Sequence, residues 1–368
     1  MSEGKLIGLA AGGTGGQMFP AEALAREMKR RGWRVILFTD KRGMRYGETF
    51  PADILLELPA SNPAISGVKA KAATGFALMR AVRQSLAAIG RHKPDIMVGF
   101  GGYPSAPAML AARLRGIPHG VHEQNAVLGR VNRLVAPKAD FVAHAFAQLD
   151  RLPEKRTGAL LELGNPVRDA MMQKARAPYV APAEFRQIDI LVFGGSQGAA
   201  LFSRVVPAAI SELPERLRQR VKITQQVREE EQEAVAAVYA EAGLQADLRP
   251  FFADMPERLA RAHLVISRAG ASSVTEIATV GRPAILVPLA IAMDDHQSGN
   301  ARVLEACGAA KVMSEGAFSA DTLRETLAAL LTGPATLAQM AKQALTVAPE
   351  RATIRLADHV EAVVAGKV

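Results

Sequence analysis

The chain has 368 residues, of which 49% are hydrophobic and 22% are charged, and its formal net charge is +9. This length favours two domains over one core, and the composition excludes a disordered chain. A single cysteine, Cys307, excludes an internal disulfide and fits a reducing compartment. No stretch reaches the roughly 18 to 20 apolar residues of a membrane-spanning helix, and the short apolar run at the N-terminus is not typical of a signal peptide.

Short apolar runs alternate with helical patterns along the whole chain. Such alternation predicts parallel sheets with right-handed helical crossovers, and ligands then bind at the carboxyl ends of the strands. The predicted strands are 5–10, 34–39, 54–58, 95–100, 141–145, 188–194, 221–226, 264–267 and 284–288.

The charge is unevenly divided between the two halves. Residues 1–168 hold 24 Lys and Arg against 13 Asp and Glu, a net charge of +11, whereas residues 169–368 hold 21 against 23, a net charge of −2. The basic first half predicts an anionic partner, such as a nucleic acid, a phospholipid surface or a phosphorylated substrate. Nucleic acid is disfavoured, because only 5% of the residues are aromatic and single strands stack on aromatic rings.

The strand pattern restarts about half-way along the chain. "LIGLAAGGTGG" and "ILVFGGSQGAA" are both buried strands followed by a glycine turn that opens a helix. This repetition predicts two Rossmann-like domains. The link falls near "ELGNPVRDA" at 162–170, where the charge shift and an Asn-Pro step coincide. The last helical pattern could pack on either domain.

Both glycine turns expose backbone N–H groups beside a helix N-terminus, an arrangement that binds anions. The turn "GGSQGA" at 194–199 suits a diphosphate, with Ser196 as a hydroxyl donor, although tight strand–helix packing would also explain the glycines. Neither turn reads G-x-G-x-x-G, and the chain has no P-loop pattern. Asp40 could mimic a ribose-binding acid, so a dinucleotide enzyme stays an alternative.

Polar residues also follow two strands of the second domain. In "SRAGASSVTEIATVGRP" at 267–283, small residues admit a nucleotide, and Glu276 could take two ribose hydroxyls unless it is merely solvated. The segment "PLAIAMDDHQSGNA" at 288–301 holds an Asp-Asp-His triplet. Consecutive side chains point in different directions, so we expect recognition of a sugar or uracil there and no metal.

In the first domain, "GFGGYPSAP" and "HEQNAVLGRVNR" bring polar residues to one sheet edge, although His122 could be a core histidine.

Seven motifs then stand in order along the chain: "GGTGGQMFPA", "GFGGYPSAP", "HEQNAVLGRVNR", "GNPVR", "FGGSQGA", "SRAGASSVTEI" and "DDHQSGNA". Together they resemble the MurG family of peptidoglycan N-acetylglucosaminyltransferases over nearly the whole chain. The resemblance implies an α/β GT-B fold, with two Rossmann-like, doubly wound parallel-sheet domains facing a central cleft. It implies an acceptor and membrane-side domain of 1–167 plus 346–368 and a UDP-GlcNAc-binding domain of 168–345.

The reaction implied by the resemblance is the inverting transfer of GlcNAc from UDP-GlcNAc to the muramyl 4-hydroxyl of lipid I, the undecaprenyl-diphosphate-linked muramyl pentapeptide. No cofactor is implied. The expected location is peripheral, on the cytoplasmic face of the bacterial inner membrane, near other proteins of cell-wall synthesis or division. Alternatives are another UDP-sugar GT-B enzyme, such as a glycolipid glycosyltransferase or a UDP-GlcNAc epimerase, and a non-catalytic UDP-GlcNAc-binding subunit.

The resemblance also assigns site residues. Ser196 would hold the diphosphate and Glu276 the ribose, while Phe252 and Ala271 would border the uracil. Gln297 would contact the GlcNAc hydroxyls beside His296, and Arg168 would reach the nucleotide. The residues implied at UDP-GlcNAc are Thr14, Gly15, Gly16, Asn125, Arg168, Ser196, Phe252, Ala271, Glu276, His296 and Gln297.

One position departs from the family pattern. The family reads GGTGGH, and that histidine is a candidate base, whereas this chain has Gln17, whose amide does not titrate near neutral pH. Three explanations compete: Glu123 or His122 is the base, the step needs no strong base, or this form is weakly active or inactive. We therefore take Glu123, His122 and Gln17 as the candidate catalytic residues.

A basic helical segment, 68–93, predicts a membrane contact. Its apolar residues Phe76, Met79, Val82, Leu86 and Ile89 share one helical stripe flanked by cations. Such a segment can lie on an anionic surface, each nearby cation contributing about 1 kcal/mol. A core-packed helix with solvated charges is the alternative. The predicted membrane contacts are Phe76, Met79, Arg80 and Arg83.

Overall fold

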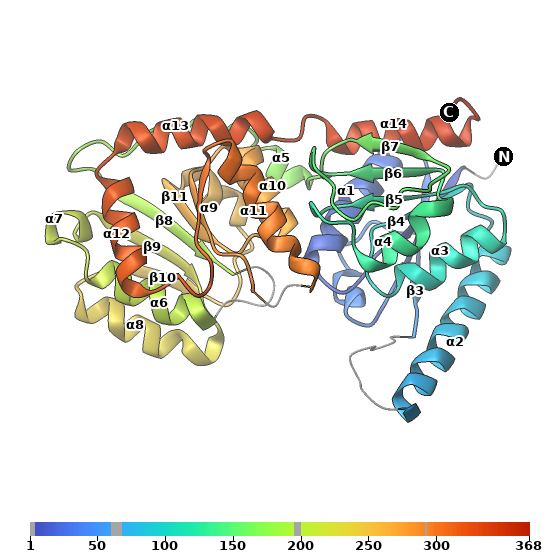
Figure 1. Ribbon diagram of the computed structural model, residues 1–368, viewed down its shortest axis with the longest axis horizontal. Coiled ribbons are helices and arrows are strands. Elements are labelled where there is room, and N and C mark those ends of the chain that lie inside the picture. The colour runs from blue at the N-terminus through green and yellow to red at the C-terminus, as the bar shows by residue number, and fades with distance from the viewer. Residues whose placement is uncertain (1–3, 60–67, 195–199, 291–292) are drawn as a thin grey trace. The chain divides into compact units, whose positions relative to one another are not determined.

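The computed structural model describes residues 4–59, 68–194, 200–290 and 293–368, and it divides into two compact units (Figure 1). Unit 1 comprises Met1–Arg168 and Pro349–Val368, and unit 2 comprises Asp169–Ala348. These bounds lie one residue and three residues from the division expected from the sequence.

Unit 1 contains a parallel sheet with the strand order β3-β2-β1-β4-β5-β6-β7. The strands are β1 (Leu6–Ala10), β2 (Arg34–Thr39), β3 (Ile54–Glu57), β4 (Ile96–Gly99), β5 (His119–Glu123), β6 (Phe141–His144) and β7 (Ala159–Glu162). The helices are α1 (Gly15–Arg30), α2 (Val68–His92), α3 (Ser105–Leu114), α4 (Arg130–Val135) and α14 (Ala352–Val364), with short 3-10 turns at Gly43–Tyr46 and Ala136–Lys138.

Both faces of the unit 1 sheet are covered, so its central strands read as continuous apolar runs. Every residue of β1 is buried, and successive side chains enter opposite layers. Ile7 and Leu9 join a core with α1 and α14, whereas Leu6 and Ala10 join a core with α2, α3 and α4.

The helix α14 belongs to unit 1 although it follows unit 2 in the chain. Nη1 of Arg31 lies 2.8 Å from both Asp358 and Glu361, and Nε1 of Trp33 donates to Glu361 at 3.0 Å. Leu356 and Val360 complete the same apolar layer as α1. Charge pairs at the rim and apolar contacts beneath them therefore hold this last helix on α1.

Unit 2 repeats the arrangement, with the strand order β10-β9-β8-β11-β12-β13. Its strands are β8 (Ile188–Phe193), β9 (Val221–Gln226), β10 (Ala246–Arg249), β11 (Leu264–Ser267), β12 (Ala284–Leu286) and β13 (Ala310–Val312). Its helices are α5 (Asp169–Met172), α6 (Ala200–Ser211), α7 (Glu215–Arg218), α8 (Gln232–Glu241), α9 (Met255–Arg261), α10 (Ala271–Val280), α11 (His296–Ala306), α12 (Ala320–Leu331) and α13 (Pro334–Ala344), with 3-10 turns at Glu229–Glu231, Met293–Asp295 and Leu345–Val347.

All nine predicted strands are present, with ends that differ by at most a few residues. The prediction lacked β5, β7, β10 and β13. In β5, two histidines and a glutamate interrupt the apolar run, although every residue of the strand is buried. The strands β7, β10 and β13 are edge strands, where burial on both faces is not required.

Candidate active site

Three loops meet at the carboxyl edge of the unit 1 sheet. The strands β1, β4 and β5 are neighbours, and all three run in parallel. Their carboxyl ends therefore bring together the Gly12–Gly16 turn, the loop after Gly99 and the loop after Glu123. The sequence motifs "GGTGGQ", "GGYP" and "HEQN" become spatial neighbours in this way.

The first glycine turn has the geometry of an anion site. Gly13 has φ +89°, a conformation that favours glycine, and α1 begins two residues later at Gly15. A Cβ added at Gly13 would lie 3.2 Å from Nη2 of Arg42, so a cation stands beside the turn. Asp40, buried at the end of β2, holds that guanidinium at 3.1 Å and accepts from the backbone of Gly43. Asp40 is thus engaged by its own loop.

Gln17 joins two of the three loops. Its amide lies between the carbonyl of Gly12 and the N–H of Gly102, with its NH₂ group toward Gly12 and its oxygen accepting from Gly102 at 3.1 Å. Gly102 has φ +80°, and a side chain there would collide with Gln17. The amide at this position therefore supplies one donor and one acceptor to the backbone around it.

His122 is fully buried at the end of β5 and is bonded through both ring nitrogens. Nε2 lies 2.9 Å from the carbonyl of Gly164, so it carries the proton, and Nδ1 accepts from Nε2 of Gln124 at 3.2 Å. Burial lowers the pKa of His122 to about 4. The imidazole is neutral at physiological pH, and its lone pair is occupied.

Glu123 receives hydrogen bonds on both oxygens. Oε1 accepts from the backbone N–H and the side-chain Nδ2 of Asn125, at 3.0 and 2.9 Å. Oε2 accepts from the N–H of Gly129 and from Nδ2 of Asn132, both at 2.8 Å. With 2% of its surface exposed, the carboxylate lies among the donors of the loop that follows it.

The segment "GNPVR" ends unit 1 and carries Arg168. Its guanidinium carbon lies 3.8 Å from the ring centroid of Phe19 on α1, a cation–π contact. A Cβ added at Gly15 would touch the same ring, so Arg168 is stacked near the glycine turn. The bond from His122 to Gly164 anchors the start of this segment. The role of Arg168 at the nucleotide stays a prediction.

In unit 2, the motif "GGSQGA" begins directly after β8, the strand that corresponds to β1. The N–H of Gly194 donates to Oε1 of Gln226 at 3.3 Å. Ser196, predicted at the diphosphate, lies outside the described residues.

The loop between β11 and α10 is held in place by the side chain of Arg268. Arg268 is buried, donates to the carbonyls of Val287 and Pro288 at 3.2 and 3.4 Å, and pairs with Glu315 at 2.5 Å. Ala271 begins α10 with its side chain buried. Glu276, half-buried, lies further along the same helix. The small residues and the carboxylate thus occupy the positions that the motif predicted, whereas the arginine is structural.

The polar residues after β12 contact different partners. Oε1 of Gln297 accepts from the N–H of Leu289 at 3.0 Å, which leaves its NH₂ group on the opposite side of the amide. His296 begins α11, and Oδ1 of Asp295 accepts from Ser298 at 2.6 Å. Within the described part of the chain, no three His, Cys, Asp or Glu side chains are grouped so that they could hold a metal ion.

The two phenylalanines after β10 differ in exposure. Phe252 is buried, and the guanidinium carbon of Arg258 lies 4.2 Å from its ring centroid. Its side chain is thus packed inside unit 2, and the contact of its main chain with the uracil stays a prediction. Phe251 beside it is 71% exposed. The sequence predicted no role for Phe251, and the repeated aromatic in "PFFAD" was the signal that could have drawn attention to it.

Comparisons with known proteins identify the family. Glycosyltransferase family 28 models match residues 7–144 as the N-terminal domain and residues 189–357 as the C-terminal domain. A Caulobacter vibrioides protein named "UDP-N-acetylglucosamine--N-acetylmuramyl-(pentapeptide) pyrophosphoryl-undecaprenol N-acetylglucosamine transferase" is 46% identical over 361 residues, which is 97% of this chain and 98% of that protein. A Rhodospirillum centenum protein of the same name is 48% identical over 358 residues, 96% of this chain and 93% of that protein.

The solved structures agree. The crystal structure of MurG from Acinetobacter baumannii has a TM-score of 0.77 and 30% identity, and it covers 98% of this chain and 99% of its own. The chain belongs to the MurG family. It is a GT-B glycosyltransferase, which confirms the fold and enzyme class predicted from the seven motifs. The UDP-GlcNAc 2-epimerase of Neisseria meningitidis, at a TM-score of 0.65 and 13% identity over 97% of this chain and 99% of its own, shares the fold alone.

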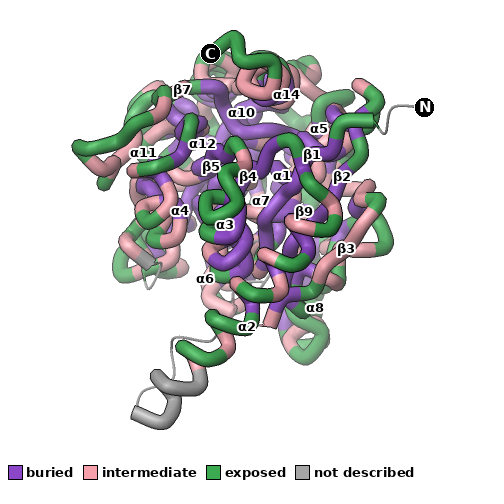
Figure 2. Tube along the Cα trace, turned by 90° about the vertical axis from the view of Figure 1, so that its right-hand side faces the viewer, coloured by how far each residue is buried: buried purple, intermediate pink, exposed green. Residues whose placement is uncertain are grey.

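In this MurG-family chain, the helix α2, which was predicted to contact a membrane, changes from exposed to buried along its length. Phe76 and Met79 in its first half are 67% and 61% exposed, and Arg80 and Arg83 beside them are exposed too. Ile89 in its second half is buried against the sheet. Figure 2 shows the exposed half projecting from the rest of unit 1. The predicted stripe therefore divides, and its second half is an ordinary core helix.

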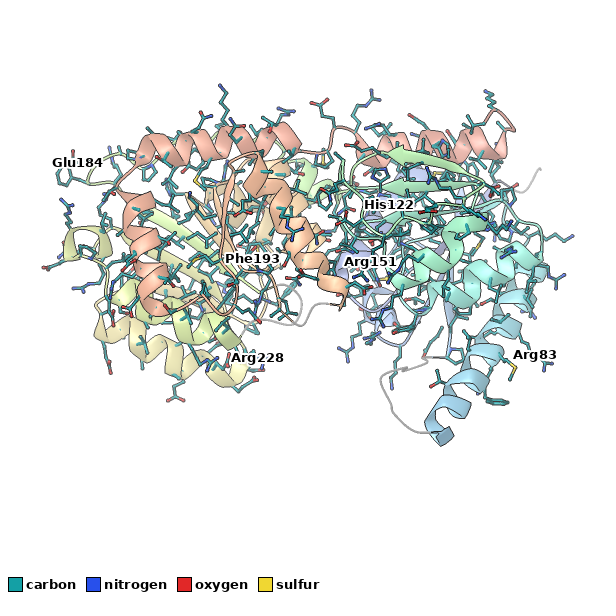
Figure 3. The ribbon with its side chains drawn as sticks, viewed as in Figure 1. Arg83, His122, Arg151, Glu184, Phe193 and Arg228 are labelled. Carbon is teal, nitrogen blue, oxygen red and sulfur yellow. The ribbon has the colours of Figure 1, made fainter. Side chains whose placement is uncertain are left out.

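Arg83 lies on this projecting helix, whereas His122 lies within the sheet of the same unit (Figure 3). No described helix, α2 included, is both long enough and apolar enough to cross a membrane. The membrane contact of Phe76, Met79, Arg80 and Arg83 stays a prediction.

Proposed function

We propose that this MurG-family enzyme transfers GlcNAc from UDP-GlcNAc to the muramyl 4-hydroxyl of undecaprenyl-diphosphate-linked muramyl pentapeptide, with inversion, and so makes lipid II from lipid I. The observation that carries this proposal is the 46% identity, over 97% of the chain, to a protein named for that transfer. A match of this length spans both units.

The donor nucleotide binds to unit 2 in this proposal. Glu276 takes the ribose hydroxyls, and the backbone at Phe252 and Ala271 borders the uracil, with Phe251 as an exposed ring on which a base can stack. Gln297 contacts the sugar through its NH₂ group, beside His296. The remaining predicted donor contacts are Ser196 at the diphosphate and Arg168 at the nucleotide.

The acceptor and the transferring sugar meet unit 1 at Thr14, Gly15, Gly16 and Asn125. The N-terminus of α1 and the cation of Arg42 favour an anionic group such as the acceptor diphosphate. UDP leaves as a developing anion, so N–H groups at helix N-termini and nearby arginines stabilise the transition state electrostatically. A strong base would assist attack by the hydroxyl, and Glu123, His122 and Gln17 were the predicted candidates.

Two of these three candidates are poor proton acceptors. Gln17 does not titrate and is bonded to two backbone groups. The lone pair of His122 accepts from Gln124, and burial holds its pKa at about 4. Glu123, the third candidate, lies beside a predicted substrate contact, Asn125.

The acceptor carries a lipid, so the enzyme must reach a membrane surface. The exposed half of α2 has apolar side chains at Phe76 and Met79 and cations at Arg80 and Arg83, the pattern of a helix that lies on an anionic surface. Unit 1 also holds the whole basic excess of the sequence. We assign the enzyme to the cytoplasmic face of the bacterial inner membrane as a peripheral protein, near other proteins of cell-wall synthesis.

The test is transfer of radiolabel from UDP-GlcNAc to a short-chain lipid I analogue, with and without a chelator. The proposal predicts labelled lipid II in both arms. Binding of UDP-GlcNAc without label in the lipid would instead support a non-catalytic subunit. Conversion of the free nucleotide sugar to its epimer would support the epimerase.

A further inference from the structure

The carboxylate of Glu123 is the most completely bonded acidic group at the edge of the unit 1 sheet. An ionised carboxylate offers about four lone-pair sites, and the four donors on Glu123 come from Asn125, Gly129 and Asn132. All four belong to the loop and first turn that follow β5. Glu123 thus folds the next nine residues back onto the end of its own strand.

We propose that Glu123 is a positioning residue that acts through Asn125 and is not the base of the transfer. This inference rests on the proposed function, because it assigns Asn125 a contact with the reacting sugars. It replaces the role that the sequence suggested for Glu123.

The first argument is the direction of the Asn125 amide. Its Nδ2 donates to Oε1 of Glu123 at 2.9 Å, so the NH₂ arm is directed toward the carboxylate. The oxygen arm of a planar amide then points elsewhere, and without Glu123 nothing in this pair would distinguish the two orientations. Asn125 is half-buried, and the orientation that Glu123 gives its amide decides which arm of the amide a bound sugar would meet.

The second argument is the cost of a proton on Glu123. A base must direct a lone pair at the hydroxyl. A proton on either oxygen of Glu123 would face an N–H of Asn125, Gly129 or Asn132, donor against donor, and one of these bonds would break. A Cβ added at Gly129 would lie only 3.3 Å from Oε2, so the loop also leaves little room for the carboxylate to turn.

The experiment is a double-mutant cycle with Glu123→Gln, Asn125→Ala and the double variant in the lipid I transfer assay. Each single variant loses about tenfold to a hundredfold in kcat/KM, the factor expected for one lost hydrogen bond. Because Glu123 acts through Asn125, the double variant falls no more than about threefold below the worse single variant. Losses that multiply would show that Glu123 does not act through Asn125 and would overturn the inference.

The pH profile gives a second readout that a purely structural role would not move. Glu123→Gln keeps the acidic limb of the kcat/KM profile of the wild type if another group, or none, takes the proton. Loss of that limb in Glu123→Gln identifies Glu123 as the base and overturns the inference.

A rescue variant covers the case in which Glu123→Gln fails to fold. Glu123→Gln places an NH₂ arm against two donors, whereas Glu123→Gln with Asn132→Asp exchanges donor and acceptor across the 2.8 Å contact. Recovery of transfer in that pair supports positioning, and a folded but inactive pair that still binds UDP-GlcNAc overturns it. Wild-type protein runs in parallel. Absence of label with wild type overturns the proposed function itself, whereas label with wild type but multiplying losses overturns only the role of Glu123.

Discussion

The carboxyl edges of the two sheets have similar strand arrangements, but their polar and aromatic side chains differ in contacts and exposure. In both units a glycine-rich motif follows the central strand in the sequence, and polar residues follow neighbouring strands. In unit 1, Gln17, His122 and Glu123 are bonded to backbone and amide groups of the loops around them. In unit 2, Phe251 is exposed and Glu276 is half-buried near a helix mouth.

This difference shows how a Rossmann-like domain can be adapted while the order of the six strands common to both sheets stays the same. The edge of unit 1 is a preorganised surface whose polar residues hold loops, so its acidic and imidazole groups are poor reagents. At the edge of unit 2, the ring of Phe251 is exposed, while a buried arginine, Arg268, anchors the backbone. This contrast predicts that substitutions in unit 2 change ligand affinity, whereas substitutions in unit 1 change stability, membrane binding or turnover.

The largest expected effect is on the donor side. Glu276→Ala removes a carboxylate that we propose to bind two ribose hydroxyls, and each charged hydrogen bond contributes about 1.5–3 kcal/mol. The Kd for UDP-GlcNAc should rise on the order of a hundredfold to a thousandfold in calorimetric titration. Glu233→Ala, an exposed glutamate on α8 of the same unit, is the matched control and should leave the Kd unchanged. Equal affinity for wild type and Glu276→Ala would remove Glu276 from the site.

The next effect concerns the closed network of unit 1. The folded protein lowers the pKa of His122 from 6.5 to about 4, so between these pH values the unfolded chain binds a proton that the folded chain does not. Stability should therefore fall as the pH drops from 6.5 to 4, by about 3 kcal/mol from this group. His122→Gln should be less stable at pH 7 but should lack this part of the slope in denaturant unfolding. Parallel slopes for the two proteins would show that His122 titrates normally.

The projecting half of α2 should govern membrane binding. Arg80→Ala with Arg83→Ala removes two exposed cations, and at about 1 kcal/mol each the partitioning onto anionic vesicles should fall about thirtyfold. The control pair Arg216→Ala with Arg228→Ala removes the same charge from exposed positions of unit 2 and should leave partitioning nearly unchanged. If both pairs weaken binding equally, net charge and not this helix is responsible.

A smaller effect is expected at the exposed ring of unit 2. Phe251→Ala should raise the Kd for UDP about tenfold if the ring stacks on the uracil, because base–aromatic stacking contributes about 1–3 kcal/mol. Phe185→Ala, which removes another exposed ring of unit 2, serves as the control. A Kd that is the same for Phe251→Ala and Phe185→Ala would show that the exposure of Phe251 has no part in binding.

The smallest effect should come from Gln17→His. A neutral imidazole also offers one donor and one acceptor, so it can join Gly12 and Gly102 as the amide does. Turnover in the transfer assay should stay within about threefold of wild type or rise. A loss of tenfold or more would show that this loop pair requires an amide.

Much of the scaffold was predictable from the sequence, because buried parallel strands read as apolar runs and glycine turns mark the strand–helix junctions. The strand β5 was not, because its burial depends on polar groups finding partners across the fold, such as His122 with Gly164. The same reason hid the role of Glu123, whose donors at Gly129 and Asn132 are visible only after the loop closes. The stripe of α2 could not be divided either, since periodicity does not tell which end of a helix has a neighbour.

The placement of α14 affects the order in which the two units can fold. Unit 2 is one continuous segment, but the apolar layer of unit 1 includes Leu356 and Val360, and Arg31 and Trp33 pair with Glu361. During synthesis, α14 leaves the ribosome after all of unit 2. Unit 2 can therefore complete its core while unit 1, although translated first, still exposes the α1 surface that α14 will cover. A nascent chain stalled before α14 should consequently be protease-resistant in unit 2 and sensitive near α1.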